Sequence, residues 1–180
     1  MKLKFDPNQQ FQQDAISAVV DLFEGQPKDA STLLSKLEQT DVSSGIKLLK
    51  LDEVGAVGNN LVLDEAAILQ NLKAVQDRNG LKVTDAFDGM NFTVEMETGT
   101  GKTYVYLRTI FELAKNYNFT KFIILVPSVA IKEGVVTSIR LMKDHFTELY
   151  AEPFDTFVYS GKSSEEVQAF ATSTNVQIMI

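Results

Sequence analysis

A glycine-rich segment in the second half of the chain carries its clearest chemistry. Residues 92–103 read Phe-Thr-Val-Glu-Met-Glu-Thr-Gly-Thr-Gly-Lys-Thr. Glycines lack a Cβ, so the backbone can adopt left-handed conformations, approach phosphate groups closely and turn successive N–H groups toward an anion. A lysine and a threonine that follow directly can add a mobile cation and a hydroxyl ligand for a metal ion. This order of residue types predicts a loop that binds a nucleoside triphosphate.

The neighbouring sequence supports that interpretation. The apolar run 92–96 predicts a strand before the loop, and apolar residues at helical spacing predict a helix over 104–116 after it. Lys102 would reach the β- and γ-phosphates of ATP, and the Thr103 hydroxyl would bind Mg²⁺, so we take both as candidate catalytic residues. The candidate ligands of ATP and Mg²⁺ are Thr98, Gly99, Thr100, Gly101, Lys102 and Thr103.

One position departs from the general pattern G-x-x-x-x-G-K-[ST], because Met96 stands where that pattern has its first glycine. The departure argues against small GTPases and kinases of small metabolites, in which glycine is usual at this position. A glycine-rich turn that binds nothing is the simpler alternative. The strand–loop–helix context argues against that alternative.

Composition excludes several other kinds of site. The 180 residues contain no cysteine and one histidine, His145, which excludes thiolate and multi-histidine metal sites. We expect His145 to be a surface residue of a helix. No apolar run reaches the roughly 20 residues of a transmembrane helix, and no apolar segment of a signal peptide follows Met1. We therefore expect a cytoplasmic protein without a membrane partner.

Charge is distributed unevenly along the chain. The formal net charge is −7, which argues against nonspecific nucleic-acid binding by the chain as a whole. Residues 101–143, however, contain seven Lys or Arg residues and two Glu residues, a net charge of +5. Either this segment contacts a polyanion or its charges lie on ordinary solvated helix faces, and charge alone favours the second.

Hydrophobic periodicity predicts helices before the loop and alternating helices and strands after it. Helices are predicted over 10–24 and 64–78, with Gly25 and Gly80 just past their ends. Weaker candidates are a helical turn at 31–37 and a strand at 46–51. After the loop, the predicted elements are a strand at 121–126 that is buried on both faces, a helix over 129–150 with a potential break near Gly134, a strand at 155–159, a helix that starts at Ser163 or Ser164, and a strand at 176–180. This order predicts an α/β fold with a mostly parallel sheet flanked by helices.

The segment 61–66 is similar to a second motif of nucleotide sites, a strand that leads into carboxylates for Mg²⁺, since its apolar residues lead into Asp64 and Glu65. In phosphate-loop proteins of this class, the strand with such carboxylates follows the loop, whereas this segment precedes it. Asp64 as an N-cap and Glu65 as a carboxylate in the first helical turn explain the pair fully. We therefore predict a helix cap rather than a Mg²⁺ site.

The loop segment 97–103 resembles motif I of superfamily 2 helicases, and two other segments are similar to motifs of that superfamily. Phe11 and Gln12 are similar to its N-terminal glutamine motif, so the resemblance assigns Gln12 to the adenine edge, which its amide can read as donor and acceptor. Pro127 and Ser128 are similar to motif Ia, which contacts the nucleic-acid backbone. Ser128 can also cap the following helix, and the two roles are compatible.

The resemblance narrows to the Res subunit of type III restriction enzymes, a family that Met96 fits. The segments that carry it are 21–27, 58–61, 75–81, 95–108, 122–131 and 133–135. The resemblance implies a RecA-like P-loop NTPase lobe, truncated after about the fourth core strand. The expected domains are an N-terminal helix with the glutamine motif (1–27), an insert with a candidate hairpin and a helix (28–90), and a partial ATP-binding lobe (91–180).

The same resemblance implies an ATP-dependent translocase that acts on double-stranded DNA with a modification methyltransferase (Mod) subunit and carries a nuclease domain. Motif II, the second lobe and the nuclease carboxylates would follow residue 180, so we expect the chain itself to hydrolyse ATP barely or not at all. Three alternatives stay open. They are another superfamily 2 helicase or type I restriction motor subunit, a phosphotransferase for a small molecule, and a non-catalytic interaction module.

Overall fold

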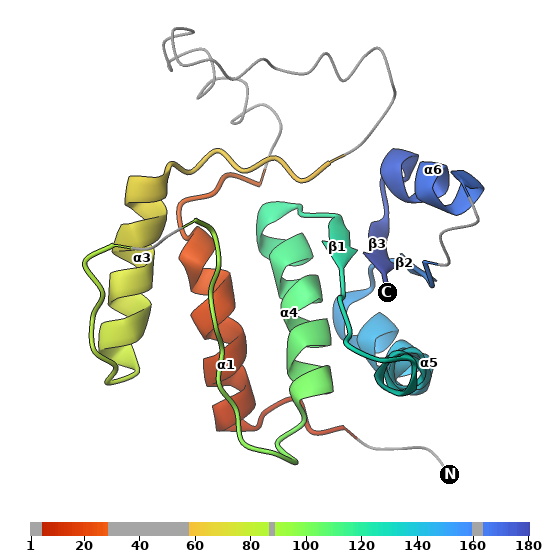
Figure 1. Cartoon of the computed structure of the whole chain (residues 1–180), viewed down its shortest axis with the longest axis horizontal. Helices are drawn as coiled ribbons and strands as arrows, with labels where there is room; N and C mark the ends of the chain where they lie inside the picture. Colours follow the sequence, from red (N-terminus) through yellow and green to blue (C-terminus); the bar gives the residue numbers. More distant parts are fainter. Residues whose placement is uncertain (1–4, 29–57, 87–88, 160–163) are drawn as a thin grey trace, which may run out of the picture.

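A computed structural model describes residues 5–28, 58–86, 89–159 and 164–180 (Figure 1). Its helices are α1 (Gln10–Val20), the 3-10 helix η1 (Asp21–Phe23), α3 (Glu65–Arg78), α4 (Lys102–Tyr117), α5 (Val129–Tyr150) and α6 (Ser164–Thr172). Its strands are β1 (Lys121–Ile123), β2 (Phe154–Phe157) and β3 (Val176–Met179). Figure 1 shows α3, α1 and α4 side by side, with the strands and α5 beyond α4.

The three strands form one parallel sheet in the order β1-β3-β2. Ile178 of the central strand pairs with Phe122 on one side and Thr156 on the other. All four residues of β3 are buried, including Gln177, whose amide group donates to Asp155 at 2.8 Å and to Ser173 at 2.9 Å. The predicted α/β class with a parallel sheet is confirmed, and the arrangement is that of part of a RecA-like lobe.

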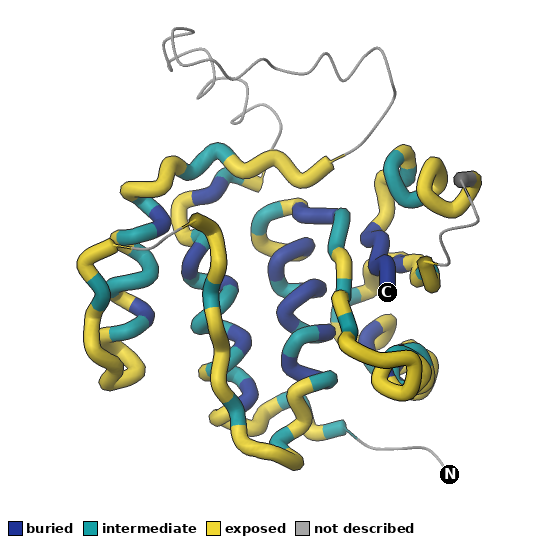
Figure 2. Tube along the Cα trace, in the orientation of Figure 1, coloured by how far each residue is buried: buried dark blue, intermediate teal, exposed yellow. Residues whose placement is uncertain are grey.

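Helix α4 lies between two hydrophobic clusters, and eight of its 16 residues are buried, as the dark blue segments of Figure 2 illustrate. The first cluster joins α4 to α5 and the sheet, and contains Tyr104, Leu107, Ile110, Phe111, Ala114, Val135, Ile139, Met142, Phe146, Phe154, Val176, Ile178 and Ile180. The second joins α4 to α1, and contains Ile16, Val20, Val105, Leu113 and Phe119. A helix with apolar residues almost all round is expected to be enclosed in this way. The helix that follows the loop is therefore held from both sides.

Helix α3 attaches to the end of the α1–η1 segment. The Asn71 side chain donates to the carbonyl groups of Leu22 at 3.0 Å and Glu24 at 2.9 Å. Arg78 forms an ion pair with Asp21 at 2.7 Å, in which the two side chains are 51% and 33% exposed. An ion pair this exposed contributes little to stability, so the amide of Asn71 is the stronger link.

Helix starts follow the predicted caps. Asp64 Oδ1 accepts a hydrogen bond from the Ala67 N–H at 2.8 Å, and Ser128 Oγ accepts one from the Ile131 N–H at 3.3 Å. The predicted break near Gly134 is wrong, because α5 runs unbroken through this residue. Glycine inside a helix costs only about 1 kcal/mol relative to alanine, and the buried side chains of α5 outweigh that loss.

The strand predictions need two corrections. Residues 92–96 lie in no strand, so the described part of the chain has three strands rather than about four. The run 121–126 is not buried on both faces. Ile123 is 62% exposed and Leu125 is 91% exposed, because the hydrophobic cluster with α4 and α5 covers only the face that carries Phe122. The candidate turn at 31–37 and strand at 46–51 lie outside the described residues.

Candidate nucleotide-binding site

The loop before α4 has the backbone geometry that its glycines predicted. Gly99 and Gly101 both adopt φ of +84°, in the left-handed region. Gly101 is the N-cap of α4, and its carbonyl group accepts the first helical hydrogen bond from the Val105 N–H at 3.0 Å. The Thr100 hydroxyl donates to the Glu97 carbonyl at 2.7 Å and closes the turn. Backbone N–H groups at such a helix start form a site for an anion.

Gln12 reaches this loop from α1. Its Nε2 atom donates to the Thr100 carbonyl at 2.9 Å, and the residue is 8% exposed. A Cβ atom added to Gly101 would lie 2.8 Å from the same Nε2 atom, closer than real Cβ contacts allow. The structure thus brings together the glutamine and the loop, 88 residues apart in sequence. The assignment of Gln12 to the adenine edge stays a prediction.

The two candidate catalytic residues begin α4. Lys102 is exposed and Thr103 is half-buried, so both side chains lie where a ligand on the loop could meet them. Among the residues that the structure describes, no three His, Asp or Glu side chains gather closely enough to hold a metal ion. The Mg²⁺ contact of the Thr103 hydroxyl stays a prediction.

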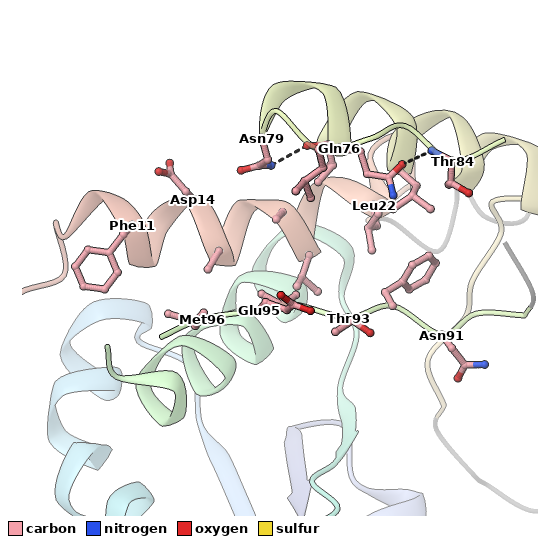
Figure 3. Close-up of a pocket in the computed structure, with 18 of the residues that line it drawn as sticks. Phe11, Asp14, Leu22, Gln76, Asn79, Thr84, Asn91, Thr93, Glu95 and Met96 are labelled. Atoms are coloured by element: carbon pink, nitrogen blue, oxygen red, sulfur yellow. Dashed lines mark hydrogen bonds between the residues drawn. The ribbon is translucent and has the colours of Figure 1, made fainter. Parts of the chain in front are cut away.

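A groove of about 990 Å³ borders the loop at Thr100. Figure 3 shows α1 and α3 on one side of it and residues 91–97 along the other. Its walls are largely apolar, with Asp14, Glu95 and Glu97 as the acidic residues, and Phe11 in the wall is 50% exposed. The sequence did not predict this groove, because it depends on how two helices far apart in sequence pack together.

The proposed DNA-contacting residues follow β1. Pro127 and Ser128 are both exposed, and Ser128 also serves as the N-cap of α5. In Figure 1, the carboxyl end of β1 and the first turn of α4 lie at the same end of the domain. Ligand sites of open α/β sheets lie at this end. A contact with the nucleic-acid backbone stays a prediction for these residues.

Sequence reasoning missed the polar side chains behind the loop. His145 is half-buried rather than a surface residue, and its Nε2 atom lies 3.1 Å from the Tyr104 hydroxyl. Burial lowers the pKa of His145, the Arg108 charge lowers it further, and Glu148 opposes the shift. Arg108 belongs to a network with Tyr150 and not to a solvated helix face. Within α4, the only sequence signal for this network was the four-residue spacing of Arg108 and Glu112, which predicts an ion pair along the helix.

Asp64→Ala should lower the free energy of unfolding by about 1 kcal/mol, since the N-cap bond to the Ala67 N–H is lost. Urea denaturation measures this loss. Nucleotide affinity should not change, because the start of α3 lies at the opposite end of the helices from the loop (Figure 1). Asp64→Asn is the matched control, since asparagine caps helices equally well. Weaker nucleotide binding in both variants at unchanged stability would instead assign Asp64 to a metal site.

Three parallel strands, with helices packed against them and a glycine-rich loop leading into α4, define an α/β domain of the RecA-like class. A family model described as type III restriction enzyme, res subunit, matches residues 8–180. The chain therefore belongs to the family of type III restriction enzyme Res subunits. Among the described helices, none combines the length and the apolar character needed to cross a bilayer.

Similar proteins include two type III Res subunits and one RNA helicase. The EcoPI Res subunit of Escherichia phage P1 is 33% identical over 165 residues, which cover 89% of this chain and 15% of the relative. The EcoP15I Res subunit of Escherichia coli is 39% identical over 111 residues, which cover 58% of this chain and 11% of the relative. The mitochondrial ATP-dependent RNA helicase MRH4 of Debaryomyces hansenii is 29% identical over 114 residues, 62% of this chain and 17% of the relative. The chain thus spans less than a fifth of each relative's length.

Proposed function

We propose that this chain is the ATP-binding part of a DNA translocase motor in a type III restriction enzyme. One observation carries the proposal. Gly99 and Gly101 are both left-handed at the head of α4, with the exposed Lys102 directly behind them. This geometry fits a triphosphate, because backbone N–H groups, the helix start and a lysine then converge on one anion.

Each loop residue has a proposed role toward ATP and Mg²⁺. Thr98, Gly99, Thr100 and Gly101 would surround the phosphates with backbone groups, Lys102 would neutralise the β- and γ-phosphates, and Thr103 would bind Mg²⁺. Gln12 would contact adenine with the part of its amide group that Thr100 does not engage. Bound Mg²⁺ would supply charge neutralisation for phosphoryl transfer.

Double-stranded DNA and a modification methyltransferase subunit are the proposed partners. Support comes from the family and from the names of the EcoPI and EcoP15I relatives, which describe restriction-modification enzymes. Pro127 and Ser128 would hold a DNA phosphate without reading the base sequence, since phosphate contacts position a protein but do not specify a site. The exposed position of both residues is compatible with that role.

Binding and hydrolysis are separate parts of the proposal. The described residues offer a phosphate cradle but no cluster of carboxylates for a metal ion. Asp64 and Glu65, the pair that imitates such a site, lie at the start of α3, and Asp64 caps it. We therefore expect the chain by itself to bind nucleotide and to hydrolyse ATP barely or not at all, since water positioning needs further groups.

Titration with a fluorescent, non-hydrolysable ATP analogue tests the proposal directly. We expect saturable binding that unlabelled ATP displaces and that weakens when EDTA removes Mg²⁺, because Mg²⁺ held by Thr103 would neutralise phosphate charge. Displacement by ATP would exclude a purely structural interaction module. An absence of binding at millimolar analogue would contradict the proposal and favour that module.

A further inference from the structure

The carbonyl group of Pro7 joins two helices behind the nucleotide loop. It accepts a hydrogen bond from Nη1 of Arg108 in α4 and another, at 3.1 Å, from Nε2 of Gln13 in α1. Arg108 lies 101 residues from Pro7 in sequence, so this is a tertiary contact. A single backbone oxygen therefore ties the start of α1 to the helix that carries the loop.

Arg108 is itself held in place from α4 and α5. Its Nε atom donates to the Tyr150 hydroxyl at 3.2 Å, and that hydroxyl donates to Glu112 Oε1 at 2.7 Å. Arg108 and Glu112 also form an ion pair at 3.9 Å, with side chains only 13% and 21% exposed. The Tyr150 ring stacks on Phe111 with centroids 5.2 Å apart and planes at 17°. The guanidinium group thus has a fixed orientation toward Pro7.

The segment around Pro7 leads directly to the loop contact. Phe5 stacks on the ring of Tyr104, in the first turn of α4, with centroids 5.9 Å apart and planes at 5°. Figure 1 shows this segment passing the first turn of α4 on its way to α1. The first turn of α1 then carries Gln12, whose amide group holds the Thr100 carbonyl at 2.9 Å. A displacement of Pro7 would move α1 and with it the glutamine on the loop.

We propose that Arg108 is a positioning residue of the nucleotide site, which acts through the Pro7 carbonyl and Gln12 on the backbone of Thr100 and Gly101. The inference rests on the proposed function, because it assigns a role toward a nucleotide on that loop. When α1 is free to move, the loop occupies its binding-competent shape for a smaller fraction of the time. The apparent affinity then falls by that fraction.

Arg108→Gln tests the inference through affinity and through the free protein. We expect roughly five- to tenfold weaker binding of the fluorescent ATP analogue. Tripolyphosphate, which has no base, should also lose affinity, since the phosphate loop is disturbed, and ATP should lose at least as much, since Gln12 moves with α1. In the absence of nucleotide, amide hydrogen exchange should rise at 98–103. Arg108→Lys should recover part of the affinity, because lysine keeps the charge but cannot reach Pro7 and Tyr150 together.

A double-mutant cycle and a matched control sharpen the test. Gln13→Ala alone should weaken binding less than Arg108→Gln. The loss of affinity in the double variant should be smaller than the sum of the two single losses, since both side chains hold the same oxygen. Arg78→Gln breaks an arginine contact at the far end of the α1–η1 segment, the ion pair with Asp21. That variant should leave affinity and exchange at 98–103 unchanged.

The outcomes separate this inference from the proposed function. A wild-type protein that binds no nucleotide contradicts the proposed function. Amide hydrogen exchange at 98–103 in Arg108→Gln still decides whether Arg108 positions the loop. Unchanged affinity and exchange in Arg108→Gln overturn the inference, as do fully additive losses in the cycle. If Arg108→Gln does not fold, Tyr150→Phe replaces it, because phenylalanine keeps the ring stacking and removes only the hydroxyl that orients Arg108.

Discussion

Lys102→Ala is expected to remove most of the nucleotide affinity of the protein. The lysine is exposed at the first position of α4, where the side chain can reach a phosphate on the loop. A charged hydrogen bond is worth about 1.5–3 kcal/mol, so the affinity for the ATP analogue should fall by about 10- to 100-fold. Any ATP hydrolysis by an enzyme that contains this chain should fall below detection, because in the proposed function the lysine would also stabilise the charge that develops in phosphoryl transfer.

Lys115→Ala is the matched control for this prediction. Lys115 is exposed on the same helix, in its last turn, and its loss removes the same charge from the opposite end of α4. It should change stability by a few tenths of a kcal/mol through the helix dipole and leave affinity unchanged. We also expect Lys102→Ala to leave assembly with a methyltransferase partner intact. Failure to assemble, or equal losses of affinity in both lysine variants, would show that Lys102 has a structural role.

Gly101→Ala is expected to have the largest effect on stability among single-methyl changes in the loop. The residue adopts φ of +84°, which costs an L-amino acid roughly 1–2 kcal/mol. The new methyl group would also lie 2.8 Å from Gln12 Nε2. Gln12 can move away only by giving up its bond to Thr100, a further loss of about 1 kcal/mol. Together these terms lower the free energy of unfolding by about 2–3 kcal/mol.

Gly99→Ala separates the cost of backbone strain from the cost of the Gln12 contact, because Gly99 has the same φ of +84° but no atom within 4 Å of an added Cβ. Urea denaturation should show a loss of about 1–2 kcal/mol for Gly99→Ala, from backbone strain alone. Gln12→Ala should cost about 1 kcal/mol in the wild-type protein but little in the Gly101→Ala background, since the bond to Thr100 is already lost there. Equal losses in the two glycine variants, with the same cost of Gln12→Ala in both backgrounds, would mean that the added methyl group does not disturb the Gln12 contact.

The loop and the helices were predictable from sequence because their determinants are local. Gly99 and Gly101 predict a left-handed backbone, and the capping residues Asp64 and Ser128 directly precede the helices that they begin. The predicted bounds of α5, 129–150, match those in the structure, since its apolar periodicity and the adjacent cap Ser128 are both local signals. In each case a few neighbouring residues decide the conformation, so the chain does not need to be folded before the pattern can be interpreted.

The failures share a different cause, which is dependence on distant partners. A strand exists only when another strand pairs with it, and the apolar pattern of 92–96 carries no information about a neighbour. Leu125 is 91% exposed, because the hydrophobic cluster packs against its neighbours Ile124 and Val126 and not against Leu125 itself. His145 is positioned by its contact with Tyr104, 41 residues away in sequence. Arg108 is positioned by its contact with Pro7, 101 residues away. No spacing rule connects residues so far apart.

The enclosure of α4 by two hydrophobic clusters has a consequence for local unfolding. Its amides can exchange with solvent only when both clusters separate, so α4 belongs to the most slowly opening part of the domain. The nucleotide loop is attached to the first residue of that helix. A ligand on the loop is therefore linked to global unfolding rather than to the fraying of a surface segment. Nucleotide binding should accordingly be visible as a rise in the melting temperature of the whole domain.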